Sequence, residues 1–511
     1  MIALSACSRA TVPGRLHVGA PDTSTMLLAA GASITADDMR RGVTYLASDG
    51  LRGRATPSPG LDSAASYLAA TYARLRLEAR GDDGTFYQRY LLRTIALDTA
   101  RTIFGTVLAD GSTPEMMEYG RDFFALPGGL PARGEPAVRL VYVGFLRNGA
   151  LPAGDYRAAL PVVVIPGGYR AAWTSDVVAA RTAAAAAGAP GVVLIADSTF
   201  SPSAFRRFAA SSVAERTTQL GPVTSGDIPV FVLTYQAFRA VTAREGTMVD
   251  HTAGSAAVFA TIRARVAAPL RVVEESMAPN IVAVLRGSDP HLRDEYVLLS
   301  AHVDHLGVGT PVAGDSIYNG ADDNASGTAA LVEIAEAFAA LPVRPRRSIL
   351  FLHVSGEERH ILGSEWFSAH PTVPADRIVA DLNVDMIGRN NPDSVVVVGK
   401  SYSSLGVVAA AVQAQHPELH LTLADDIWPE KRLFFRSDHY NFARRNIPSI
   451  FFFAGEHADY HRPTDTVDRL DVEKAARIAR MIFYFAYEIA TVPDRPRWTS
   501  VGLAAVQPQR P

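Results

Sequence analysis

Lysine, cysteine and long apolar runs are all scarce in this chain. Three of its 49 basic residues are lysines, and its one cysteine is Cys7. A lone cysteine excludes an internal disulfide and a thiolate-bound zinc cluster. A membrane-spanning helix needs about 18 or more consecutive apolar residues, and the sequence contains no such run. The formal net charge of −3 gives no reason to expect nucleic acid as a partner.

The composition is that of a large globular protein. The chain has 511 residues, of which 48% are hydrophobic and 20% are charged. A chain of this length can bury a large core and is expected to divide into at least two domains.

The surroundings of Cys7 suggest how the chain begins. The segment LSAC at 4–7 resembles the bacterial lipobox, whose cysteine is acylated, although the basic and apolar signal regions expected before it are missing. A start codon assigned too far downstream would explain their absence, and a chance match is the alternative. Residues 1–30 are thus predicted to be a truncated lipoprotein signal and a tether. The protein would then lie in the bacterial cell envelope, as a periplasmic or outer-membrane lipoprotein, or be secreted, with a lipid anchor as its one membrane contact.

The next two segments differ in their hydrophobic pattern. Residues 31–100 contain two amphipathic helical patterns, at 37–48 and 61–77, which we expect to cover one face of a sheet formed by later residues. From 101 to 267 short β-like runs surround one alanine-rich helix at 175–188. No His, Asp and Glu cluster with ligand spacing occurs there, so this segment is predicted to be an inserted, non-catalytic, β-rich domain.

Strands alternate with helices from 268 to 495. The pattern predicts strands at 280–285, 295–301, 348–355, 378–387, 394–399 and 449–454, and helices at 328–341, 363–369, 404–414 and 472–489. Such alternation predicts an α/β fold in which a mainly parallel, mixed sheet is sandwiched by helices. Ligands of such sheets bind beyond the carboxyl ends of the strands. Residues 496–511, rich in proline and arginine, are predicted to be a flexible tail.

Polar residues follow the predicted strand at 295–301. His302 and Asp304 are two residues apart, so in extended chain they share a face. The carboxylate of Asp304 could then accept a hydrogen bond from the imidazole nitrogen that does not hold a metal. Asp322 and Asp323 follow in a glycine-flanked turn, just before a predicted helix. Carboxylates in that turn could reach a cation held by His302.

Three further strand ends carry polar side chains that a core would not choose, namely those of Glu357, Glu358, Asp385, His457, Tyr460 and His461. Carboxylates mixed with imidazoles suit Zn²⁺, with Mn²⁺ or Co²⁺ as possible substitutes. A catalytic zinc takes about three protein ligands besides water, so a larger set predicts two metals that share a carboxylate. Neighbouring residues in extended chain point in opposite directions. One of Glu357 and Glu358 is therefore expected to bind metal, and the other to act as a base.

These motifs resemble those of the M28 family of co-catalytic zinc peptidases, most of which are aminopeptidases. The matching segments, in the order of the family, are AHVDHLG (301–307), NGADDNASG (319–327), SGEE (355–358), NVDMIG (383–388), RSDH (436–439) and YH (460–461). The segments LASD (46–49) and GR (53–54) are similar to the lead-in of the family, and 101–267 is similar to a protease-associated (PA) domain. The resemblance thus covers residues 35–490, with 268–495 as the catalytic peptidase domain and 31–100 as its N-terminal part.

The resemblance implies a set of metal ligands. His302 and Asp385 would hold one zinc, Glu358 and His461 would hold the other, and Asp322 would bridge both. The bridging aspartate of the family usually precedes a cis peptide bond, here the one between Asp322 and Asp323.

The resemblance also implies catalytic roles. Glu357 would be the general base, Asp304 the partner of the ligand His302, and Tyr460 a residue that stabilises the tetrahedral intermediate. Asp438 has two interpretations: it contacts the ammonium group of the substrate, or it caps the following helix. A structural role or a position at the rim is expected for His305, His439 and His457, and a structural role for Arg54.

The function predicted from the sequence is that of a di-zinc exopeptidase, an aminopeptidase that cleaves N-terminal residues from peptides by way of a metal-bridging hydroxide. Carboxypeptidase and dipeptidase action stay open. An M20-type hydrolase is disfavoured, because its extra domain lies between the fourth and last ligands, whereas here the insertion precedes His302. A glutaminyl-cyclase-like acyltransferase and a catalytically silent binding protein share the fold. The full ligand set speaks against the first, and the presence of Glu357 speaks against the second.

Overall fold

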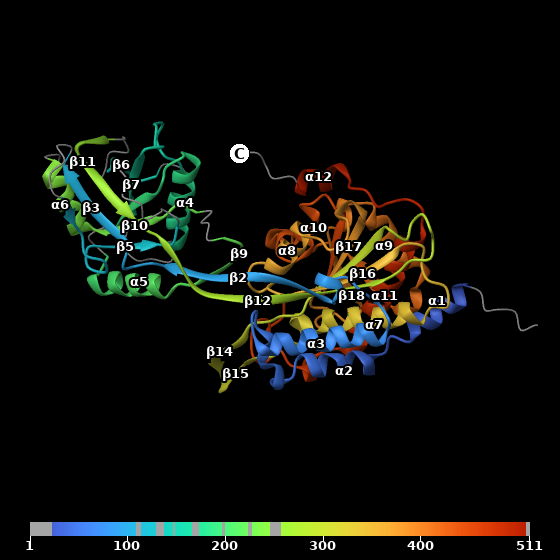
Figure 1. Ribbon diagram of the computed structural model, residues 1–511. Helices are drawn as coiled ribbons and strands as arrows, with labels where there is room; N and C mark the ends of the chain where they lie inside the picture. The colour runs from blue at the N-terminus through green and yellow to red at the C-terminus, as the bar shows by residue number, and fades with distance from the viewer. Residues whose placement is uncertain are drawn as a thin grey trace, which may run out of the picture. The chain divides into compact units, whose positions relative to one another are not determined.

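The computed structural model describes residues 23–108, 114–128, 137–146, 149–165, 173–196, 200–222, 227–245 and 257–506. Cys7 lies outside these residues, so the lipid anchor stays a prediction. The chain divides into two compact units, one formed by Met1–Tyr90 and Ala278–Pro511 and the other by Leu91–Met277 (Figure 1). The insertion predicted at 101–267 lies within the second unit. Within the described parts of the chain, no helix has the length and apolar character needed to cross a membrane.

A mixed β-sheet forms the centre of the first unit, with the strand order β19-β18-β20-β17-β13-β16-β12-β2. The strands are β1 (Glu78–Ala79, paired with β12), β2 (Tyr87–Leu97), β12 (Leu270–Leu285), β13 (Tyr296–His302), β16 (Ser348–Val354), β17 (Ile378–Val384), β18 (Ser394–Val398), β19 (Thr422–Ala424) and β20 (Ser449–Phe453). The four central strands β16, β13, β17 and β20 are parallel, whereas β12 and β18 pair antiparallel with their central neighbours. The predicted α/β fold is confirmed.

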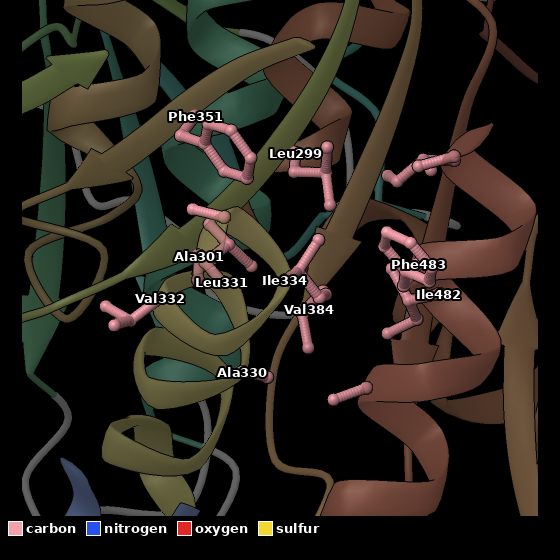
Figure 2. Packing of buried hydrophobic residues seen from close by; sticks show 14 of the residues in the cluster. Leu299, Ala301, Ala330, Leu331, Val332, Ile334, Phe351, Val384, Ile482 and Phe483 are labelled. Atoms are coloured by element: carbon pink, nitrogen blue, oxygen red, sulfur yellow. The ribbon is translucent and has the colours of Figure 1, made fainter. Parts of the chain in front are cut away.

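Helices cover both faces of this sheet. They are α1 (Thr23–Ala32), α2 (Ala36–Leu46), α3 (Pro59–Arg74), α7 (Gly327–Ala340), α8 (Leu362–Ala369), α9 (Leu405–Gln415), α10 (His439–Ala443), α11 (Val472–Thr491) and α12 (Ser500–Val506). Leu299 of β13 lies in one core cluster with Ile334 of α7 and Phe483 of α11 (Figure 2). Its neighbour Leu298 points to the opposite face and shares another cluster with Phe442 of α10. A strand buried on both sides is the expected centre of a parallel sheet.

Two predictions about the ends of the chain were wrong. Part of the segment predicted as a flexible tail forms α12, and the backbone N–H groups of Arg497 and Thr499 donate hydrogen bonds to Ser404 Oγ and the Tyr402 carbonyl. Part of the predicted tether forms α1, where Ala30 is buried and Leu27 packs against the core. These contacts are made with residues far away in sequence, and local composition does not report them.

The second unit has its own eight-stranded sheet, in the order β4-β3-β11-β6-β7-β8-β10-β5. Its strands are β3 (Ile103–Leu108), β4 (Glu115–Met116), β5 (Phe123–Leu126), β6 (Val138–Gly144), β7 (Ala159–Ile165), β8 (Val192–Ala196), β10 (Val230–Thr234) and β11 (Ala257–Ala267), and β9 (Thr217–Leu220) pairs with the later part of β2. Side chains of α4 (Trp173–Ala186) and α5 (Pro202–Ala214) share one core cluster, and those of α6 (Tyr235–Glu245) belong to another. The similarity of this unit to a PA domain stays a prediction.

Candidate metal centre

The carboxyl ends of the central strands bring one histidine and two carboxylates together. His302 is the last residue of β13, Asp385 directly follows β17, and Asp323 lies in the π-helix Ala321–Ser326 that precedes α7. His302 Nε2 is 3.2 Å from Asp385 Oδ1 and 3.3 Å from Asp323 Oδ1. All three residues are buried, and their ligand atoms lie within 4.8 Å of one another. This is a suitable donor set for a divalent cation.

A second group forms around the other oxygen of Asp323. His305 Nδ1 is 2.7 Å from Glu358 Oε1 and 3.7 Å from Asp323 Oδ2. His461 Nε2 is 3.2 Å from Asp323 Oδ2 and 3.3 Å from Glu358 Oε2. Asp323 thus turns one oxygen to each group. The sequence did not assign His305 to this group, although it directly follows the His-x-Asp motif.

The prediction that Asp322 joins the two groups is contradicted by its position. Asp322 Oδ1 accepts a hydrogen bond of 2.6 Å from the Gly388 N–H, and its Oδ2 is 3.3 Å from His457 Nε2. The cis peptide bond lies between Asp323 and Asn324, not between Asp322 and Asp323. The carboxylate of Asp465 accepts hydrogen bonds from the N–H groups of both aspartates and holds the turn in this orientation.

Asp304 lies beside His302, but the contact differs from the predicted one. His302 Nδ1 is 3.1 Å from the backbone carbonyl oxygen of Asp304, which fixes that nitrogen as the donor, and 3.8 Å from the carboxylate. The carboxylate instead accepts hydrogen bonds from Thr56 Oγ1 at 2.8 Å and from the Glu357 N–H at 3.3 Å. Asp304 therefore orients the loop that carries Glu357 as well as the ring of His302.

Glu357 and Tyr460 line a small pocket together with Asp323 and Asp385. Burial, with Glu358 and Asp438 nearby, raises the pKa of Glu357 well above its usual value. Burial, with further contributions from Asp323 and Glu358, raises the pKa of Tyr460 as well, so its hydroxyl stays protonated. The ring of Tyr460 stacks on His461 at a centroid distance of 3.8 Å.

Asp438 does not occupy the position that either prediction requires. It is fully buried and is not among the residues that line the pocket, and its side chain makes no capping hydrogen bond to α10. Burial raises its pKa to about 7. His439 is buried against Phe434 and Phe451, in agreement with the structural role expected for it.

The electrostatics of the two groups fit a bound cation. Burial by itself would lower the pKa of His302, but Asp385, Glu357 and Asp323 together raise it well above its usual value. Asp323 and Glu358 raise the pKa of His461 to about 10 against the same opposing effect of burial. In both cases the cause is the negative charge of, and the hydrogen bonds with, the surrounding carboxylates. A divalent cation would compensate this charge in place of the protons.

Arg54 supports these loops from the N-terminal part of the chain. Its guanidinium is buried and donates to the carbonyl oxygens of Leu46, Val303, Asn319 and Gly320. Val303 follows His302, and Gly320 precedes the π-helix of Asp323. The structural role expected for Arg54 is thus to hold the two loops of the first group together.

The sequence matches a known family over this part of the chain. The model of Peptidase family M28 matches residues 280–486. These residues form an M28 peptidase domain. The family predicted from the motifs is therefore confirmed for this segment, which contains His302, Asp323, Glu358, Asp385 and His461.

Two curated relatives match less than half of this chain. A probable leucine aminopeptidase of Arthroderma benhamiae is 25% identical over 231 residues, which are 43% of this chain and 60% of the relative. A probable leucine aminopeptidase of Arthroderma otae is 27% identical over 220 residues, 42% of this chain and 58% of the relative. The chain thus spans about 60% of the length of these curated relatives.

Solved structures resemble the chain over most of its length. The aminopeptidase from Aneurinibacillus sp. strain AM-1 is 18% identical, with a TM-score of 0.49, and the match covers 91% of this chain and 96% of that one. BSAP, a zinc aminopeptidase from Bacillus subtilis, is 17% identical, with a TM-score of 0.48, and the match covers 90% of this chain and 96% of that one.

Proposed function

We propose that this protein is a zinc-dependent aminopeptidase that releases N-terminal residues from peptides. Two Zn²⁺ ions would be held, one by His302 and Asp385 and the other by Glu358 and His461, with Asp323 between them. The observation that carries the proposal is that Asp323 directs its two oxygens to two separate histidine–carboxylate groups. His305 lies close enough to Glu358 to orient it or to add a ligand.

The side chains around the metal groups suit peptide hydrolysis. Bound here, zinc would supply a water molecule of lowered pKa and polarise the scissile carbonyl. Glu357 would take the proton of the attacking water and return it to the leaving nitrogen. Burial raises the pKa of Glu357 above its usual value, which makes its carboxylate a stronger base. Tyr460, protonated and in the same pocket, would donate a hydrogen bond to the developing oxyanion.

The charges in the pocket favour a free amine over a free carboxylate at the end of the substrate. A carboxypeptidase needs a cation that is available to the terminal carboxylate. Among the described residues that line the pocket, Arg436 is the one cationic side chain, and its guanidinium already donates to Glu456 Oε1 at 3.0 Å. The acidic groups of the pocket would attract an ammonium group instead. The names of the matched fungal relatives support the same direction of action.

Apolar side chains also line the pocket and would contact the side chain of the N-terminal residue. They are those of Leu433, Phe451, Phe453 and Met386. Burying an apolar side chain there contributes about 25 cal/mol for each Å² of apolar surface removed from water. An apolar N-terminal residue is therefore the expected preference.

The test is hydrolysis of aminoacyl-p-nitroanilides and dipeptides by the purified protein, before and after chelation and zinc restoration. We expect zinc-dependent cleavage of substrates with a free amine and none of their N-acetylated forms. Glu357→Gln should lower kcat by about 10²- to 10⁴-fold while zinc stays bound. The matched variant Glu358→Gln should lose zinc.

Two outcomes would contradict the proposal. Cleavage of N-acetylated peptides that requires a free C-terminal carboxylate would indicate a carboxypeptidase. A zinc-loaded wild type that cleaves none of these substrates would indicate the acyltransferase or the binding protein on the same fold.

A further inference from the structure

Behind Asp385 a row of hydrogen-bonded side chains extends into the sheet. Asp381, Asn383 and Asp385 occur at alternate positions of β17 and its end, so they share a face. Ser300 of the neighbouring β13 is paired in register with Asn383, and Ser437 precedes α10. All five residues are buried, and Ser300, Asp381 and Asn383 have no exposed surface.

The contacts form a continuous chain. Ser300 Oγ is 2.7 Å from Asp381 Oδ1 and 3.1 Å from Asn383 Oδ1. Asn383 Nδ2 donates to Ser437 Oγ at 2.9 Å, and Ser437 Oγ donates to Asp385 Oδ2 at 3.0 Å. The chain therefore runs from Asp381 to an oxygen of a candidate metal ligand.

This chain is one proton short when both carboxyl groups are ionised. It has four contacts, and the two hydroxyl groups and one amide supply one proton each, or three in total. If Ser300 donates to Asp381, then Oδ1 of Asn383 faces a hydroxyl oxygen without a proton between them. If the amide is rotated by 180°, its N–H donates to Ser300 and its oxygen faces Ser437. The hydroxyl of Ser437 has one proton, which it must then share between Asn383 and Asp385. One of the four contacts therefore still lacks a proton. One carboxyl group must carry the fourth proton.

Asp381 is the group that fits this requirement. A carboxylate must be ionised to hold a metal, which excludes Asp385. Asp381 Oδ2 has no hydrogen-bond partner among the described residues, and Asp438, the titratable group that faces Asp381 from the start of α10, is itself acidic. An ionised carboxylate buried without a cation or a full set of donors is strongly disfavoured. Burial raises the pKa of Asp381 well above its usual value, in agreement with a neutral group.

We infer that Asp381 is a protonated positioning residue whose carboxyl proton sets the direction of the whole hydrogen-bond chain. Asp381 donates to Ser300, Ser300 to Asn383, Asn383 to Ser437, and Ser437 to Oδ2 of Asp385. Oδ2 of Asp385 is thereby held toward Ser437. Oδ1 of Asp385, which lies 3.2 Å from His302 Nε2, is the oxygen presented to the metal site. The role of this chain in metal binding, and the exclusion of Asp385 as the protonated group, rest on the proposed function, whereas the burial of Asp381 and its oxygen without a hydrogen-bond partner do not depend on it.

The protonation of Asp381 can be tested by infrared difference spectroscopy of the zinc-loaded protein at pH 8. Asp381→Asn keeps a neutral group with an N–H donor toward Ser300. The spectrum of this variant minus that of the wild type should show the loss of one carboxylic acid C=O band. Asp438→Asn, the neighbouring buried carboxyl, is the matched control and should keep that band. Loss of a carboxylate band in Asp381→Asn, with no acid band lost, would overturn the inference.

Zinc affinity, measured by competition with a chelator, tests the positioning. Asp381→Asn should bind zinc within about threefold of the wild type, whereas Asp381→Val, which cannot donate, should bind about 10- to 100-fold more weakly. Ser437→Ala should weaken binding to a similar degree. In the Asp381→Val/Ser437→Ala double variant, the two losses should not add, because each breaks the same chain.

Additive losses, or equal affinities of the Asn and Val variants, would contradict a chain that acts through its proton. Circular dichroism of each variant checks that it folds. If Asp381→Val does not fold, the pair Asp381→Asn and Ser437→Ala still decides. Tight zinc binding by Asp381→Asn together with weak zinc binding by Ser437→Ala supports the chain. Weak zinc binding by Asp381→Asn with tight zinc binding by Ser437→Ala refutes it. None of these measurements requires peptide hydrolysis, so they stay informative if the proposed activity is wrong.

Discussion

Asp322 and Asp323 are adjacent in the sequence, but their side chains face different partners. Asp323 contacts His302 with one oxygen and His461 with the other, whereas Asp322 accepts from the Gly388 N–H. We expect Asp323→Asn to abolish binding of zinc at both groups, because an amide is a poor replacement for a carboxylate between two cations. Asp322→Asn should keep zinc, since the amide oxygen can still accept from Gly388. Zinc per protein, measured after dialysis against a low zinc concentration, would decide.

The control for this comparison is the melting temperature of both variants in the absence of metal. A loss of zinc by Asp322→Asn with normal folding, or full zinc retention by Asp323→Asn, would mean that the first aspartate is the shared ligand after all.

The sequence predicted the residue types of this site better than their exact assignment. His302, Glu358, Asp385 and His461 lie where the strand ends indicated. Spacing does not distinguish two adjacent aspartates in a glycine-flanked turn, and the family resemblance implied Asp322 as the shared ligand, whereas Asp323 occupies that position. Asp323 has φ −105° and ψ 92°, which no helical or strand periodicity anticipates. The turn is oriented by the carboxylate of Asp465, which accepts from the N–H groups of both aspartates, and by the Gly388 N–H, which donates to Asp322; both partners are distant in sequence.

At the scale of elements, α7 carries a buried acid whose titration should affect stability. Burial, with a smaller contribution from Glu336, raises the pKa of Glu333 to about 7. The folded protein thus holds this proton more tightly than the unfolded chain does. The stabilisation is complete below pH 4.5 and is lost as the pH rises through about 7.

Glu333→Gln should remove this dependence. Between pH 5 and pH 8 the wild type should lose about 2 kcal/mol more of its free energy of unfolding than the variant, allowing for the partial exposure of the group. Urea unfolding at the two pH values measures the difference. Glu365→Gln, an exposed acid on α8, is the matched control and should change the free energy of unfolding by less than about 0.5 kcal/mol. Equal pH dependence in Glu333→Gln and wild type would contradict the titration of Glu333.

Most of the helices and strands near the site could be predicted because their apolar patterns are local. The strands at 348–355 and 449–454 and the helices at 328–341 and 472–489 correspond to β16, β20, α7 and α11 within a few residues. The sequence did not predict α5 or β2. α5 begins at Pro202 after the N-cap Ser201, but its apolar face is short, and half of β2 is only partly buried. Elements with weak amphipathic patterns depend on tertiary contacts that a single sequence does not display.

At the scale of the whole molecule, each unit has its own hydrophobic core. The clusters around α7 and α11 contain residues of the first unit, and those around α4, α5 and α6 contain residues of the second. The chain leaves through β2 and returns through β12, and the Asp98 N–H donates to the Pro269 carbonyl at 2.9 Å. The two ends of the segment 99–268 are therefore adjacent, as is typical of an inserted domain.

This arrangement predicts that the segment 99–268 can be replaced by two glycines without loss of the metal site. Every residue assigned here to zinc binding or catalysis belongs to the first unit, so the shortened protein should bind zinc with the stoichiometry of the full chain. It should also hydrolyse aminoacyl-p-nitroanilides with a kcat within a few fold, because these substrates are small. Zinc content and p-nitroanilide release measure these two properties, and circular dichroism checks that the shortened protein folds. The control is the shortened protein with Glu357→Gln, which should bind zinc but lack activity.

A shortened protein that folds but has lost zinc would show that the second unit is needed to form the site. If it keeps zinc and loses activity on small substrates alone, the second unit takes part in the reaction itself.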